Sequence, residues 1–173
     1  IYNPNFSVSP ITTHLPINKI SRAISKKKII DKIFKINEFY KKYLKKIPRI
    51  ALLGLNPHCE TIDKIGEEEK YIIPALNYLK KKKIRIKGIF SPDTFFSKKN
   101  LENFDVAVGM YHDQVLTPMK TIYEFNAINI TIGLPFVRIS PDHGPNNLML
   151  GKNISNAESF FASIDFIKKI NAV

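Results

Sequence analysis

The chain has 173 residues, of which 44% are hydrophobic, so it can bury the core of one domain but hardly the cores of two. No apolar run approaches the ~20 residues of a membrane-spanning helix, and a single cysteine excludes an internal disulfide framework, so we expect a cytoplasmic protein without a membrane partner. The net charge of +12 would suit a polyanion, but only four of the 27 basic residues are arginine. Lysine runs at 26–28, 41–46 and 80–83 are expected at solvated helix ends, and nucleic acid is not an expected partner because no aromatic-plus-basic module is present.

The first ten residues lack the basic start and apolar core of a signal peptide and are expected to be irregular. Apolar residues at three- or four-residue spacing then predict an amphipathic helix over 28–46. The apolar run 50–55 predicts a buried strand. A second helix should follow Gly66, with Pro74 near its first turns.

Further strands are expected at 84–90, 105–110 and 127–132. A last helix is expected at 156–170, with an apolar stripe made of Phe160, Phe161, Ile164 and Ile167. Strands that alternate with helices predict an α/β domain with a largely parallel sheet.

Polar clusters follow three of these strands, at 56–58, 91–94 and 111–114. The carboxyl ends of parallel strands meet at one edge of a sheet, where loops converge on ligands. We therefore expect these clusters to lie at one edge and to form the candidate site.

The four histidines, His14, His58, His112 and His143, all lie in polar, turn-like settings. Neutral imidazole is a favoured ligand of zinc and similar ions, and a catalytic site needs three protein ligands plus an open position. His58 and His112 could meet at the sheet edge. Taken singly, each histidine is better explained as completing a turn or satisfying a loop, since their wide spacing forms no motif. Cys59 is interpreted as a small filler rather than a nucleophile.

Lys120, Asn129 and Arg138 form a second set at nine-residue intervals, expected on a loop, a strand and the turn after it. A guanidinium and an ammonium group can hold a phosphate or carboxylate, and an amide can orient it. Lys120 alone could be an ordinary solvated lysine. Arg138 is more specific, because this composition otherwise supplies lysine.

Five stretches in series extend these clusters: residues 12–16 (TTHLP), 54–58 (GLNPH), 92–94 (PDT), 110–114 (MYHDQ) and 129–138 (NITIGLPFVR). In order and approximate spacing they resemble the 4-hydroxythreonine-4-phosphate dehydrogenases of pyridoxal phosphate biosynthesis. The resemblance spans essentially the whole chain, and motifs of this length are more specific than a lone glycine fingerprint.

The resemblance implies a three-layer α/β/α fold, similar to isocitrate and isopropylmalate dehydrogenases, in a homodimer with a shared active site. It implies that His14, His58 and His112 bind a divalent metal such as zinc, magnesium or cobalt across the dimer interface. It also implies that Lys120, Asn129 and Arg138 bind a phosphorylated amino-acid substrate. Family members are about twice this length, so residues 1–173 would be the carboxyl-terminal portion, without the amino-terminal half.

The implied reaction is NAD-dependent oxidation of the substrate's secondary alcohol to a ketone, followed by loss of carbon dioxide. A dication lowers the pKa of the alcohol and stabilises the oxyanion. Asp93 and Asp113 are candidates for relaying the alcohol's proton or for orienting the histidines, and the sequence does not separate these roles.

Two departures from the family pattern fall on the cofactor side. The loop at 59–66 keeps a single glycine, Gly66, where the family has a glycine run that lets backbone approach a ligand. The resemblance implies that Asp142, His143 and Gly144 contact the dinucleotide, but Pro145 and Asn146 follow in place of threonine and alanine.

Three alternatives remain open at the level of sequence. A related dehydrogenase of threonate or erythronate phosphate would use the same metal and phosphate groups. A non-catalytic metal-binding or dimerisation fragment would account for the altered loops and the missing half. A basic, polyanion-binding protein is the last.

Overall fold

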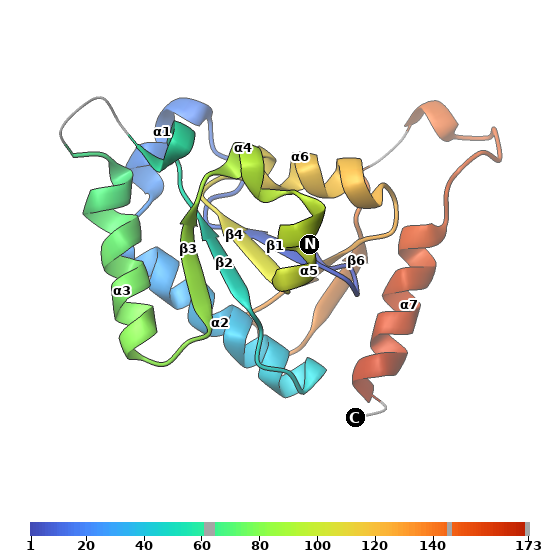
Figure 1. Cartoon of the computed structure of the whole chain (residues 1–173). Helices are drawn as coiled ribbons and strands as arrows, with labels where there is room; N and C mark the ends of the chain where they lie inside the picture. Colours follow the sequence, from blue (N-terminus) through green and yellow to red (C-terminus); the bar gives the residue numbers. More distant parts are fainter. Residues whose placement is uncertain (61–64, 145–146, 172–173) are drawn as a thin grey trace.

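Four parallel strands form the central sheet, in the order β1-β4-β2-β3 (Figure 1). The computed structural model describes residues 1–60, 65–144 and 147–171. The strands are β1 (Ser7–Pro10), β2 (Ile50–Leu53), β3 (Ile86–Phe90) and β4 (Val106–Gly109). The predicted β2, β3 and β4 are confirmed. The expectation of an irregular stretch at 1–10 is wrong, because its last four residues pair with β4 as an edge strand.

Helices cover both faces of this sheet and make the three layers of an α/β/α fold (Figure 1). One face carries α1 (Ile17–Ala23), α2 (Lys26–Leu44), the π-helical turn η2 (Glu68–Ile72) and α3 (Ile73–Lys81). The other face carries α4 (Pro92–Phe95), α5 (Lys98–Asn103) and α6 (His112–Tyr123). The predicted fold class is therefore confirmed.

The sequence of β2 shows why this strand lies at the centre. Ile50 and Leu52 pack into the core beneath α2 and α3, while Ala51 and Leu53 pack into the core beneath α4 and α6. All four side chains are fully buried. A strand that is covered on both faces needs a continuous apolar run rather than alternation, and that is the pattern at this position.

Helix α2 confirms the prediction for residues 28–46 within two residues at each end. It begins after Ser25, whose hydroxyl accepts a hydrogen bond of 3.3 Å from the amide of Lys28, and it ends at Lys45 in a left-handed conformation. Ile29, Ile33 and Ile36 lie on one face and are buried in the core, as their spacing predicts.

A separate antiparallel ribbon lies beside the sheet and consists of β5 (Ile128–Thr131) and β6 (Arg138–Pro141). Reciprocal backbone hydrogen bonds of 2.8 and 2.9 Å join Tyr2 to Ile128 and so connect the ribbon to the segment that leads into β1. The predicted strand 127–132 is confirmed as β5, but its antiparallel partner β6 was not predicted.

Helix α7 (Glu158–Asn171) confirms the last predicted helix and packs against the ribbon (Figure 1). The prediction of which residues form the buried face of α7 is wrong. Phe160, Phe161 and Ile167 are exposed, and Ile164 is half-buried. Phe166 is the buried aromatic residue of this helix; it stacks on Phe39 of α2 and meets Tyr2 edge-on.

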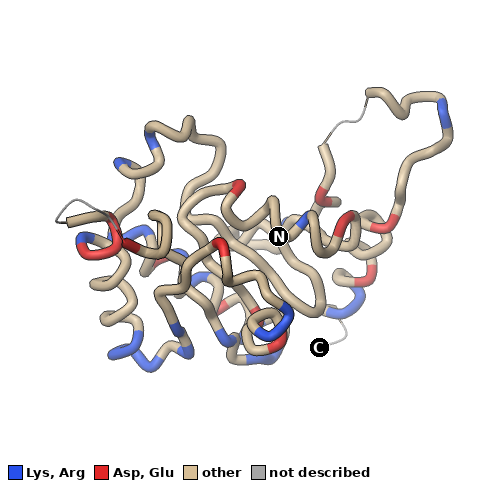
Figure 2. The backbone as a smooth tube through the Cα atoms, turned by 45° about the horizontal axis from the view of Figure 1, so that its top comes forward, with Lys and Arg blue, Asp and Glu red and all other residues tan. Residues whose placement is uncertain are grey.

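At the amino-terminal edge of the sheet, Asp105 is buried and accepts hydrogen bonds from Arg49 and Lys46. These contacts tie the starts of β2 and β4 together. The remaining Lys and Arg residues are spread over several parts of the fold, with acidic segments between them, rather than gathered in one stripe (Figure 2). Among the described residues, none of the helices combines the length and apolar character needed to cross a bilayer.

Candidate active site

The carboxyl ends of β2, β3 and β4 carry the three predicted polar clusters, and the end of β1, which was not predicted as a strand, adds His14. His14 follows β1, His58 follows β2, Asp93 follows β3, and His112 follows β4 as the first residue of α6. The expectation that these clusters lie at one edge is confirmed by the parallel topology.

His14 and His112 face each other because β1 and β4 are neighbours. Their ring centroids are 5.7 Å apart. The Nδ1 atom of His112 lies 2.7 Å from a carboxylate oxygen of Asp113, so the ring is held by one nitrogen and can present Nε2 to a ligand. Two imidazoles in this arrangement offer the nitrogen ligands that borderline divalent metal ions such as zinc prefer.

His58 has a different partner. Its Nδ1 atom lies 3.7 Å from a carboxylate oxygen of Asp93, at the end of the neighbouring strand. The Ser91 hydroxyl, and to a smaller extent His58, holds the pKa of Asp93 below its usual value. Among the described parts of the chain, no group of three His, Cys, Asp or Glu side chains converges as a metal site requires. Within one chain, then, His58 does not complete a site with the other two histidines.

Two of the three histidines have strained backbones. His14 has φ of 52° and His58 has φ of 56°, in the left-handed region that residues with a Cβ atom rarely adopt. Such conformations cost about 1–3 kcal/mol and persist where the surrounding structure imposes them, most often at functional sites.

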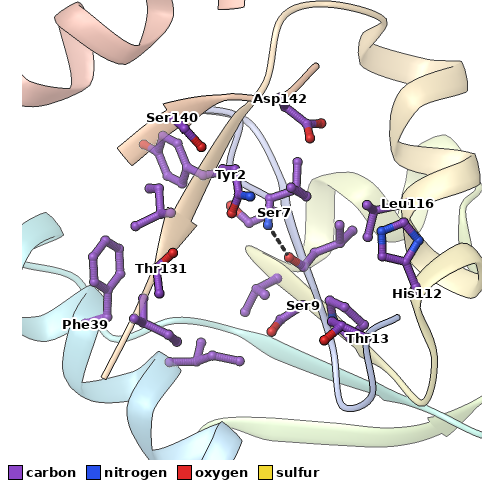
Figure 3. Close-up of a pocket in the computed structure, with 18 of the residues that line it drawn as sticks. Tyr2, Ser7, Ser9, Thr13, Phe39, His112, Leu116, Thr131, Ser140 and Asp142 are labelled. Carbon is purple, nitrogen blue, oxygen red and sulfur yellow. Dashed lines mark hydrogen bonds between the residues drawn. The ribbon is translucent and has the colours of Figure 1, made fainter. Parts of the chain in front are cut away.

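A cavity of about 690 Å³ lies beside the histidine pair and reaches the ribbon (Figure 3). In Figure 3, His112 and Leu116 lie on one side of β1, and Thr131 and Ser140 lie on the other. The cavity collects seven predicted site residues from four parts of the chain: His14, His112, Lys120, Asn129, Asp142, His143 and Gly144. His58, Asp93, Asp113 and Arg138 are not among the residues that line it.

The ribbon presents a polar face to this cavity. Asn129 is paired with Ser140 and Thr131 with Arg138, and directly paired residues of neighbouring strands project to the same face. A guanidinium nitrogen of Arg138 donates to the Thr131 hydroxyl at 3.2 Å. Arg138 therefore lies on strand β6 rather than on a turn, and two hydroxyl residues that we did not predict, Thr131 and Ser140, belong to the same face.

Lys120 also differs from its predicted position, because it lies on helix α6 rather than on a loop. Its ammonium group donates to the backbone carbonyl of Asp142 at 3.1 Å and lies 3.4 Å from the Asp142 carboxylate. The backbone of Asp142 is fixed in turn, because its amide donates to the Ser159 hydroxyl of α7 at 2.7 Å. The predicted phosphate ligand and the predicted cofactor segment are thus in direct contact.

Cys59 is half-buried and lies close to Gly54. Burial raises the pKa of its thiol, which favours the protonated, less nucleophilic form. This agrees with the interpretation of Cys59 as a filler. The part of the altered loop at 61–64, and Pro145 and Asn146 in the second departure from the family pattern, lie outside the described residues.

A parallel α/β/α sheet that gathers histidines, carboxylates and cations at the carboxyl ends of its strands has the ligand-binding edge of an open α/β fold, and comparisons with known proteins show the family. The family model of the pyridoxal phosphate biosynthetic protein PdxA matches residues 1–167. The chain belongs to this family.

Similar proteins bear this out. A 4-hydroxythreonine-4-phosphate dehydrogenase of Sulfurihydrogenibium sp. (strain YO3AOP1) is 45% identical over 160 residues, which are 91% of this chain and 49% of that protein. A crystal structure of the enzyme of the same name from Klebsiella pneumoniae has 32% sequence identity and a TM-score of 0.82, covering 98% of this chain and 52% of that one. A terephthalate 1,2-cis-dihydrodiol dehydrogenase from Burkholderia xenovorans LB400 has a TM-score of 0.74 at 19% identity and shares the fold. The chain spans about half the length of the curated relatives it matches.

Proposed function

We propose that this chain supplies the metal- and substrate-binding half of an NAD-dependent 4-hydroxythreonine-4-phosphate dehydrogenase. The reaction would oxidise 4-phosphohydroxy-L-threonine to 2-amino-3-oxo-4-phosphooxybutanoate, which decarboxylates to 3-amino-2-oxopropyl phosphate. The observation that carries the proposal is the cavity that collects His14, His112, Lys120, Asn129 and the Asp142 segment. Family membership and the names of the relatives support the same activity.

The donor set of the metal site supports a shared site between two copies of the chain. His14 and His112 face each other, but a catalytic metal site takes three protein ligands. His58 lies beside Asp93 on the β3 side, and among the described residues it does not converge with the other two histidines, so we place the third ligand of each site on a second copy of the chain. The proposal therefore includes a homodimer in which each site takes histidines from both chains.

A divalent cation at this position, zinc, magnesium or cobalt, would lower the pKa of the substrate's secondary alcohol and so assist loss of hydride to NAD. Asp113 holds Nδ1 of His112 at 2.7 Å, which fixes the ring with Nε2 available. We assign Asp113 to orienting His112 and Asp93 to orienting His58, because each carboxylate lies beside one of these rings. Either carboxylate could also accept the proton of the alcohol, being exposed to the solvent.

The phosphate of the substrate would lie between Lys120 and the polar face of the ribbon. Asn129 and Arg138 come from that face, and Thr131 and Ser140 add two hydroxyl donors. A phosphate carries three acceptor oxygens, so an ammonium, a guanidinium and neighbouring hydroxyls can satisfy it together. NAD would approach along Asp142, His143 and Gly144, where a Cβ atom added to Gly144 would have no neighbour within 4 Å and the backbone is open to a ligand.

Metal analysis and kinetics test this function. The purified protein should contain a stoichiometric divalent cation that is lost in His14→Ala, His58→Ala and His112→Ala, and equal metal content in all four proteins would contradict the metal site. The full-length protein should reduce NAD only with both metal and 4-phosphohydroxythreonine. A preference for threonate or erythronate phosphate would identify the related dehydrogenase. Absence of NAD binding by calorimetry would favour a non-catalytic fragment.

A further inference from the structure

A chain of buried hydrogen bonds links the three strand ends that carry the histidines. The hydroxyl of Thr12, two residues before His14, donates to the carbonyl of Met110 at 2.7 Å. The amide of Met110 donates to the side-chain carbonyl of Gln114 at 2.6 Å. The side-chain NH₂ of Gln114 donates to the carbonyl of Gly54, at the end of β2, at 2.9 Å.

The loop that leads from Gly54 to His58 is held from its other side by Glu68. This carboxylate is 1% exposed, and one of its oxygens accepts from the amides of Leu55 and Asn56 at 2.7 and 2.8 Å. Its other oxygen accepts from the Asn56 side chain at 2.7 Å. The backbone just before His58 is therefore fixed by two buried polar side chains, Gln114 and Glu68.

Glycines leave room for both side chains. A Cβ atom at Gly109 would lie 2.7 Å from the carbonyl oxygen of Gln114, and one at Gly54 would lie 3.1 Å from a carboxylate oxygen of Glu68. A larger residue at Gly109 would have to displace Val115, whose Cγ1 would lie 2.5 Å from the added Cβ, as well as the side chain of Gln114. The sequence therefore keeps small residues where these polar groups approach the strand ends.

We propose that Gln114 is a positioning residue that sets the His58 loop against the strand end that carries His112. The inference rests on the proposed function, in which both histidines bind metal. A primary amide suits this position because it has a carbonyl oxygen that accepts and an NH₂ group that donates. Here the oxygen accepts from the amide of Met110 after β4, and the NH₂ group donates to the carbonyl of Gly54 after β2. The positions of His58 and His112 then both depend on the buried side chain of Gln114, two residues after His112.

The first test uses the metal-free protein. Hydrogen–deuterium exchange of the amides at 55–59 and 110–112 should be at least tenfold faster in Gln114→Met, which fills the same space without either hydrogen bond. Gln114→Asn keeps the amide group, but its side chain is one methylene shorter and cannot reach both partners. Exchange at 55–59 and 110–112 should therefore also become faster in this variant. The control is Val115→Ala, a buried neighbour that packs into the core beneath α6. It should lower the melting temperature without selective acceleration in these two segments.

The second test uses Co²⁺, whose visible absorption reports ligand geometry. The variants at Gln114 should bind Co²⁺ 10- to 100-fold more weakly than the wild type and show altered bands, the range typical for loss of groups that orient metal ligands. Val115→Ala should stay within twofold of the wild type. Unchanged exchange at 55–59 and 110–112 in both Gln114 variants would overturn the positioning role, whether or not metal binds. A wild-type protein that binds no Co²⁺ would instead overturn the proposed function, and the exchange data would still decide the role of Gln114.

Discussion

The ammonium group of Lys120 donates to the backbone carbonyl of Asp142 at 3.1 Å, and the carboxylate of the same residue lies 3.4 Å away. One side chain on α6 thus connects the proposed phosphate site with the segment proposed to meet NAD. Because Lys120 is already placed by this contact, a phosphate can bind without ordering a free lysine side chain first.

Replacing Lys120 by methionine should weaken binding of 4-phosphohydroxythreonine about 10- to 100-fold, since a hydrogen bond to a charged group contributes about 1.5–3 kcal/mol. Asp142→Asn retains the backbone carbonyl that Lys120 contacts, so it should change the affinity less than tenfold. Titration calorimetry measures both. Lys168→Met is the control, because Lys168 pairs with Asp165 on the exposed side of α7. An equal loss in the control would contradict a specific role for Lys120.

The buried carboxylate Asp105 should make stability depend on acid. Burial alone would raise its pKa, but hydrogen bonds from Arg49 and Lys46 outweigh burial and lower the pKa to about 2. A carboxyl whose pKa is lower in the folded than in the unfolded state stabilises the fold above its unfolded pKa, near pH 4, and loses that contribution as the pH falls towards 2.

Asp105→Asn should therefore cost about 1–3 kcal/mol of unfolding free energy at pH 7, because the amide cannot pair with two cations. Its deficit relative to the wild type should shrink as the pH is lowered from 4 to 2.5. Urea unfolding at several pH values gives both quantities. Asp165→Asn serves as the comparison, since its carboxylate is exposed and its loss should be nearly neutral at every pH.

The left-handed backbone at His14 and His58 predicts an unusual order of stabilities. At these positions glycine should be more stabilising than alanine by about 1 kcal/mol, because a Cβ atom is strained at positive φ. Urea unfolding of His58→Gly and His58→Ala without metal compares the two directly. At Glu38, an exposed position inside α2, the order should reverse by a similar amount. The same order at both positions would contradict the backbone conformation described for His58.

The faces of α7 make a fourth prediction. Phe166→Ala should cost about 3–5 kcal/mol, because Phe166 is 3% exposed and packs on Tyr2 and Phe39. Phe161→Ala should change stability by less than about 0.5 kcal/mol, because this side chain is 61% exposed. Thermal unfolding separates them. Equal costs would mean that the exposed aromatic face is covered in the protein in solution.

The spacing and runs of apolar residues correctly predicted those elements whose own sequence determines which side chains are buried. Helix α2 and strand β2 follow from spacing and from a continuous apolar run, and both lie where expected. Strand β1 could not be predicted in this way, because its four residues become a strand by pairing with β4 about 100 positions away. The period of α7 showed which residues share a face, but not that Phe160 and Phe161 would lie outward, since that depends on neighbouring elements.

The same division applies to the site. Parallel topology was enough to place the polar clusters after β2, β3 and β4 at one edge. The approach of His14 to His112 required knowledge that β1 and β4 are adjacent. Gln114 belongs to the stretch MYHDQ but received no role, because a buried amide shows its function only through the backbone atoms it contacts. Thr131 and Ser140 were detectable in principle from the two-residue alternation that they share with Asn129 and Arg138.

The hydrogen bond from Thr12 to Met110 joins residues that are 98 positions apart. We expect such a contact to form late in folding, because closing a long loop costs entropy before the pairing compensates for it. During synthesis, β1 is made well before β4 and cannot pair as a strand until β4 has also been made. A nascent chain that has not reached residue 110 would already carry His14 and His58, yet it would have no sheet edge on which to gather them.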